Sequence, residues 1–125
     1  MEKFSRPRFL NLLQISFPAT AILSILHRIS GVVLTLYLPL SLVLFERSLL
    51  SADSFQQLPQ LWDVLLVRLL VVAGLWALSH HMISGVRILL LDFGVGIAGE
   101  DAQRSAYVVA GASISTLLWI LWGLV

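Results

Sequence analysis

Three long apolar stretches dominate this sequence and limit its fold more than any other feature. They run from about residue 19 to 45, from 64 to 91 and from 106 to 125. A hydrocarbon core of roughly 30 Å needs about 20 apolar residues in a helix, and a helix satisfies its own backbone hydrogen bonds in lipid. We therefore predict an all-α membrane protein with three transmembrane helices. Because the chain shows no internal repeat, we expect a single transmembrane domain over residues 1–125.

The scarcity of charge supports a location in a membrane. Of the 125 residues, 58% are hydrophobic and 12% are charged, whereas about 25% are charged in a typical soluble domain. The formal net charge of +1 gives no sign of a nucleic-acid partner. The sequence has no cysteine, which excludes disulfides, thiolate metal sites and iron–sulfur clusters within it. A cofactor held by this sequence must therefore use other ligands.

The basic residues near the ends of the stretches predict an orientation. Loops that stay in the cytoplasm carry an excess of Lys and Arg. One side of the predicted bundle has five such residues and the other has two: Lys3, Arg6, Arg8, Arg87 and Arg104 against Arg47 and Arg68. We therefore expect the N-terminus in the cytoplasm and the C-terminus outside. The first residues have the features of neither a signal peptide nor a transit peptide, which favours a multi-pass protein of a bacterial inner (cytoplasmic) membrane.

Titratable side chains inside two of the stretches need an explanation, because such groups are costly in lipid. The first stretch contains His27 and Arg28, and the second contains His80, His81 and Arg87. At ~1.5 Å per residue, His27 and His81 both fall ~12–15 Å from the cytoplasmic boundary. Antiparallel neighbouring helices would thus place two imidazoles at the same depth, which suits a haem or another metal site.

Simpler roles compete with that interpretation. Spacing alone leaves His81 evenly balanced between a ligand and a packing residue, whereas His80, about 100° away around the helix, is favoured as a packing residue. Arg28 and Arg87 are expected to snorkel to the cytoplasmic headgroups. Elsewhere we expect packing or boundary roles, for Trp76 in the second stretch and for the pair Asp63 and Arg68 at its start.

Two motifs resemble a known family. The run from Arg6 to Gly31 contains S-x-x-H-R-x-S-G, and the segment from His80 to Gly94 contains H-x-x-x-G-x-R-x-x-x-x-D. Both are similar to motifs of the cytochrome b-556 subunits of succinate dehydrogenase, the larger membrane anchors of succinate:quinone oxidoreductase. Length and number of apolar stretches agree with that family, so the resemblance covers nearly the whole chain.

The resemblance implies a cofactor and its ligands. In that family one haem b lies between this subunit and a second hydrophobic anchor subunit, and each subunit gives one axial histidine. His81 matches the axial ligand to the haem iron, and His27 and Arg28 match contacts to the haem propionates. Ser24 and Arg28 match residues that hydrogen-bond ubiquinone. Asp92 is a further candidate beside the quinone, although it equally suits a cap for the following loop.

The resemblance also implies a function. The chain would be a membrane anchor subunit of succinate dehydrogenase (complex II), with no catalytic residue of its own, in a complex with an iron–sulfur subunit and a flavoprotein. Electrons would pass from the iron–sulfur subunit to ubiquinone. Many family members have a second histidine where this chain has Ile88, so any role of that histidine is absent here.

Other functions stay open on the sequence. The chain could be an anchor of a quinol:fumarate reductase, which runs the reaction in the other direction. A small transport or proton-conducting subunit with His27, Arg28 and His81 as a relay is a second alternative. A haem-free structural scaffold is a third.

Overall fold

The computed structural model describes residues 16–124, and within them the chain is helical without a strand. Three long helices are α1 (Ala19–Leu50), α3 (Leu65–Asp92) and α4 (Gly99–Gly123); the short helix α2 (Ala52–Gln57) and the 3₁₀-helix η2 (Leu58–Asp63) join α1 to α3. The three long helices are apolar and long enough to cross a membrane, which confirms the predicted fold class. The residues Lys3, Arg6 and Arg8, on which the predicted orientation partly rests, lie outside the described range.

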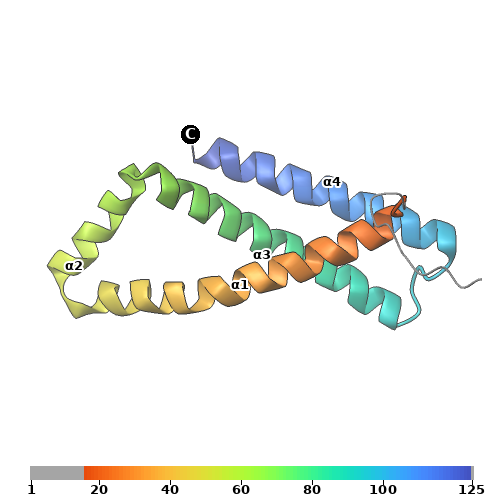
Figure 1. Cartoon of the computed structure of the whole chain (residues 1–125), viewed down its shortest axis with the longest axis horizontal. Helices are drawn as coiled ribbons and strands as arrows, with labels where there is room; N and C mark the ends of the chain where they lie inside the picture. Colours follow the sequence, from red (N-terminus) through yellow and green to blue (C-terminus); the bar gives the residue numbers. More distant parts are fainter. Residues whose placement is uncertain (1–15, 125) are drawn as a thin grey trace, which may run out of the picture.

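The helices form an open bundle in which α3 packs against both other long helices (Figure 1). Helix α4 packs along α3, and α1 crosses α3 so that its first turns also contact α4. Helices α1 and α3 diverge toward the ends that α2 and η2 connect. In that connection Arg68 pairs with Asp63 at 3.9 Å, as expected, and also donates to the carbonyl of Trp62.

Local chemistry sets the helix ends. Helix α3 ends because Gly94 takes φ +81°, a left-handed conformation that glycine adopts without strain. The amides of Gly94 and Val95 then bond back to the carbonyls of Leu91 and Leu90, both at 2.9 Å, which satisfies two carbonyls at the helix end. Helix α4 begins at Gly99, well before its apolar stretch, with acidic residues in its first turn that favour a helix N-terminus.

The interior of the bundle is small and partly polar. A hydrophobic cluster of Leu23, Ala106 and Val109 lies among the three long helices, whereas most large apolar side chains are exposed. Four polar residues are buried instead: Ser30, His80, Ser84 and Ser113. Lipid takes the place of water around such a bundle, so close packing and hydrogen bonds between helices hold it together.

A tight contact marks the point beyond which α1 and α3 separate. The Tyr37 hydroxyl of α1 donates to the carbonyl of Leu70 in α3 at 2.7 Å. The ring lies against Gly74, where an added Cβ would come within 2.5 Å of a ring carbon. Past this contact an apolar cavity of about 460 Å³ opens between the two helices. Gly74 is therefore required by the packing of Tyr37.

We predict that Gly74→Ala destabilises the protein while Gly111→Ala does not. Alanine gains about 0.5–1 kcal/mol over glycine within a helix, but at Gly74 the overpacking against Tyr37 costs ~1–3 kcal/mol. A Cβ at Gly111, in the middle of α4, meets nothing within 4 Å. Thermal unfolding in detergent should show a lower Tm for Gly74→Ala and an equal or higher one for Gly111→Ala. Equal Tm values for both variants would contradict the contact.

The predicted orientation can be tested at the two connections between the long helices. Ser51, between α1 and α2, and Val95, between α3 and α4, are both exposed and lie at opposite ends of the bundle. Since the chain has no cysteine of its own, single substitutions Ser51→Cys and Val95→Cys give clean labelling sites. In intact cells an impermeant thiol reagent should label position 51 and leave position 95 unlabelled. The reverse pattern would overturn the orientation.

Candidate functional site

Two histidines stack where α1 crosses α3. The rings of His27 and His81 are nearly parallel, with centroids 4.1 Å apart and an angle of 11° between their planes. This contact confirms the prediction that the two imidazoles lie at the same depth on neighbouring antiparallel helices. Each ring also lies over a glycine of the opposite helix, Gly85 beneath His27 and Gly31 beneath His81.

The hydrogen bonds of His81 fix which ring nitrogen carries hydrogen. Nδ1 of His81 lies 3.1 Å from the Ser30 hydroxyl oxygen and 3.2 Å from the carbonyl oxygen of His27. The Ser30 hydroxyl gives its own hydrogen to the same carbonyl at 2.7 Å, so both neighbours of Nδ1 accept. Nδ1 is therefore the donor, and Nε2 of the neutral ring has a free lone pair. A histidine that ligates a metal is typically held in this way.

The other histidine of the stack has an unsatisfied atom. Nε2 of His27 is buried and has no hydrogen-bond partner among residues 16–124. A Cβ at Gly85 would lie 3.6 Å from this nitrogen, so the helix backbone approaches closely but offers it no partner. A buried polar atom without a partner costs ~1–3 kcal/mol. A group from outside the described part of the chain would remove that cost.

His80, the neighbour of His81, belongs to the face of α3 that packs against α4. It is 1% exposed, and its Nδ1 lies 2.8 Å from the Ser113 hydroxyl of α4 while its Nε2 lies 3.2 Å from the Ser84 hydroxyl. Its ring stacks on Trp76, whose indole donates to the Ser113 carbonyl at 3.0 Å. Both nitrogens of His80 are thus occupied inside the bundle, as a packing role predicts.

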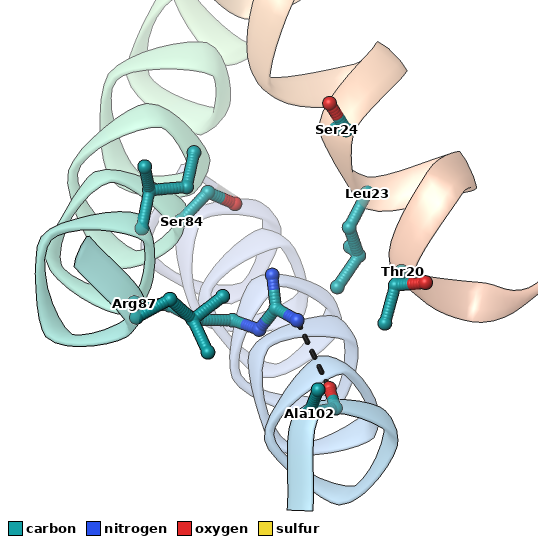
Figure 2. Close-up of a pocket in the computed structure, with 8 residues that line it drawn as sticks. Thr20, Leu23, Ser24, Ser84, Arg87 and Ala102 are labelled. Atoms are coloured by element: carbon teal, nitrogen blue, oxygen red, sulfur yellow. Dashed lines mark hydrogen bonds between the residues drawn. The ribbon is translucent and has the colours of Figure 1, made fainter. Parts of the chain in front are cut away.

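Ser24 is at the edge of a cavity at the end of the bundle where α1 begins and α3 ends. The cavity has a volume of about 330 Å³, and its walls come from all three long helices: Thr20, Leu23, Ser24, Ser84, Arg87, Ile88, Leu91 and Ala102. Figure 2 shows this space and the side chains around it. Arg28, one turn beyond Ser24, is exposed and does not line it. The two residues matched to quinone binding therefore face different surroundings in this chain.

The expected snorkelling of Arg87 is wrong. Its Nε donates to the Ser105 hydroxyl and its Nη2 to the carbonyl of Ala102, both at 2.9 Å. The dashed line in Figure 2 marks the second of these bonds. Helix α4 starts at Gly99, so its polar first turns reach the level of Arg87 and offer acceptors there. The guanidinium consequently turns inward to α4 instead of outward to the headgroups.

Asp92 is the last residue of α3 and is exposed. Within the described residues no ion pair joins it to Arg28. No cluster of three or more metal-ligating side chains occurs there either. A metal at the histidine stack would therefore take at most two ligands from the described residues and the others from elsewhere.

Sequence reasoning missed three contributors to these sites. Ser30 is part of the first motif, but nothing in the sequence indicates that its hydroxyl contacts Nδ1 of His81. Ser113 had no distinguishing signal in the third apolar stretch, yet it holds His80. Arg87 was expected at the headgroups. It lies near the end of the second apolar stretch, and a short loop follows before the third, so a contact with the next helix could have been considered.

Comparison with known proteins shows which family the sequence of this chain matches. Residues 2–120 match the succinate dehydrogenase/fumarate reductase transmembrane subunit family. The chain is 40% identical over 123 residues to the succinate dehydrogenase cytochrome b556 subunit of Coxiella burnetii, covering 94% of this chain and 95% of that one. It is 27% identical over 118 residues to the subunit of the same name from Paracoccus denitrificans, covering 94% and 91%.

A further relative is the succinate dehydrogenase hydrophobic membrane anchor subunit of Halobacterium salinarum, 32% identical over 100 residues and covering 75% of this chain and 77% of that one. The three apolar helices define a multi-pass membrane protein. The chain belongs to the family of transmembrane subunits of succinate dehydrogenase and fumarate reductase, which are non-catalytic parts of an enzyme complex.

Proposed function

We propose that this chain is the membrane anchor subunit of a bacterial succinate dehydrogenase (succinate:ubiquinone oxidoreductase) in the cytoplasmic membrane. It binds one haem b together with a second hydrophobic anchor subunit and forms part of the site where ubiquinone is reduced. The observation that carries the proposal is the hydrogen bonding of His81, which occupies Nδ1 and leaves the Nε2 lone pair for iron. The names of the relatives, cytochrome b556 subunits, favour the succinate dehydrogenase over a fumarate reductase.

The residues around the stack fit a haem held between two subunits. His81 would give one ligand to the haem iron, and the partner anchor would give the second. The buried Nε2 of His27 needs a polar partner, which a propionate would supply, and the exposed Arg28 guanidinium suits the same carboxylate. When bound, haem b would supply a one-electron carrier.

The quinone site would use hydrogen-bond donors at the cytoplasmic end of α1. A quinone carbonyl oxygen gains negative charge on reduction, so a hydroxyl and a guanidinium stabilise it more as the reaction proceeds. Ser24 has no hydrogen bond to another described side chain or carbonyl, and Arg28 is likewise without an ion pair among residues 16–124. Both side chains are therefore available to a ligand.

Other subunits complete the proposed enzyme. A flavoprotein oxidises succinate, an iron–sulfur protein passes the two electrons on, and protons enter from the cytoplasmic side. Asp92, exposed at the end of α3, is the candidate on this chain for passing those protons to the site. The short apolar loop from Phe93 to Ala98, in which Phe93, Val95 and Ile97 are exposed, lies at the same end and would face the iron–sulfur protein.

We expect His81→Ala to remove the b-type absorption band of the purified complex, whereas His80→Gln keeps it. The first change removes the nitrogen that would bind iron, and the second leaves Nδ1 of His81 and its partners unchanged. Reduced-minus-oxidised spectra of the complex measure the band. Added imidazole should restore part of the band in His81→Ala, since the small ligand fits the space that the side chain leaves.

His80→Gln is the matched control because glutamine keeps polar atoms near Ser84 and Ser113. Loss of the band in His80→Gln together with a normal band in His81→Ala would reverse the ligand assignment. Normal bands in both variants would mean that neither His80 nor His81 binds the haem iron.

Ser24→Ala and Arg28→Leu should each lower succinate:ubiquinone reductase activity about tenfold to a hundredfold, the range for losing a hydrogen bond that involves a charged group. Succinate oxidation with an artificial acceptor should persist, because that reaction bypasses the quinone. Thr35→Ala, which removes a hydroxyl bonded only to its own helix, serves as a control. Equal loss of both activities would mean failed assembly and would contradict a quinone role.

A further inference from the structure

Arg87 is a charged side chain without a charged partner inside the bundle. It lies on α3, one turn beyond Ile83, and no ion pair joins it to a carboxylate within residues 16–124. Its two bonded nitrogens contact only a hydroxyl and a carbonyl. An arginine within an apolar helix of membrane-spanning length that has no counter-charge is a candidate functional residue.

The guanidinium also retains bonding capacity on the side of the cavity. Its Nε and Nη2 are occupied by Ser105 and Ala102, and Nη1 has no hydrogen-bond partner among the described residues. Figure 2 shows one terminal nitrogen bonded to Ala102 and the other directed away from it, into the cavity. The contacts to α4 hold the guanidinium in place, so this remaining donor has a fixed position.

The cavity beside Arg87 is the one that Ser24 lines. Its volume of about 330 Å³ is at the lower end of the range for ligand pockets, which suits a single ring. Leu23, Ile88 and Leu91 give it apolar walls. Among the described residues that line it, Arg87 is the only cation.

From this geometry we propose that Arg87 is a quinone-binding residue, whose Nη1 donates to a carbonyl oxygen of ubiquinone while the ring lies in the cavity beside Ser24. The inference rests on the proposed function and adds a donor to it. One side of the guanidinium is already used by Ser105 and Ala102, and a single free nitrogen matches a single carbonyl oxygen better than a phosphate or carboxylate, which favour paired donors.

The role of Arg87 is binding and charge stabilisation, without proton transfer. Ubiquinone takes two electrons from the iron–sulfur subunit and two protons from cytoplasmic water to become ubiquinol. The guanidinium keeps its own protons throughout, because arginine stays charged in proteins. It stabilises the negative charge that the carbonyl oxygen gains with the first electron.

The test compares two arginine substitutions in the assembled complex. Arg87→Gln should raise the KM for a short-chain ubiquinone about tenfold to a hundredfold, and Arg87→Lys should restore part of the loss. Arg104→Gln is the matched control: Arg104 lies near the same end of the bundle but is exposed and paired with Glu100 and Asp101. It should leave the KM unchanged, and the haem band and artificial-acceptor activity should be normal in all three.

Ser105→Ala separates quinone binding from a purely structural tether. It removes the partner of Nε but leaves the charge and Nη1, so a binding role predicts a KM much closer to the wild type than that of Arg87→Gln. If Ser105→Ala raises the KM as much as Arg87→Gln does, Arg87 acts only through its tether to α4 and the proposal is overturned.

A photoreactive ubiquinone analogue gives a second readout on the unmodified complex. It should label the segment 20–24 of α1 and the first turns of α4, and excess ubiquinone should suppress the labelling. Labelling of α1 without α4 would overturn the proposal. It would also be overturned if phospholipid suppressed the labelling and excess ubiquinone did not.

The outcomes also separate this inference from the proposed function. If Ser24→Ala and Arg28→Leu impair quinone reduction and Arg87→Gln does not, the proposed function stands and the role of Arg87 fails. If none of the three changes affects quinone reduction, the quinone site on this chain fails as well.

Discussion

The crossing of α1 and α3 is the contact on which the rest of this structure depends. Two imidazoles stack there at 4.1 Å, and each lies over a glycine of the opposite helix. At Gly31 the fit is tight, since a Cβ would lie 3.1 Å from a carbon of the His81 ring. The close approach depends on the missing side chain at Gly31, and it brings the carbonyl of His27 within 3.2 Å of Nδ1 of His81.

The two adjacent histidines of α3 divide its contacts between its neighbours. Successive residues of a helix point about 100° apart, so His81 faces α1 while His80 faces α4. The hydrogen bond of His80 to Ser113 and the bond from Trp76 to the same residue's carbonyl fix α3 against α4. These bonds determine the rotation of α3 about its axis. They thereby determine the direction in which His81 points, although the hydrogen bonds of the His81 ring are to α1.

The sequence predicted the features that depend on length and depth. Apolar stretches of membrane-spanning length predicted the three helices, and counting residues from a common boundary predicted that His27 and His81 would meet. It could not predict the rotation of the helices, because these helices are apolar on nearly all sides and no polar stripe marks the buried face. The roles of Ser30 and Ser113 depend on that rotation. The direction of Arg87 was wrong because the polar residues that begin α4 lie outside the apolar stretch from which the span was measured.

The arrangement has polar groups that the described chain does not satisfy by itself. Nε2 of His27 is buried without a partner, and the Arg87 guanidinium faces a cavity without a counter-charge. In a medium with little water such groups are expensive, so a bundle built only for stability would have apolar residues at these positions. The cost is offset once ligands or partner subunits supply the missing contacts. Folding of this chain is thereby linked to assembly, since each group that binds the folded bundle and not the unfolded chain adds to its stability.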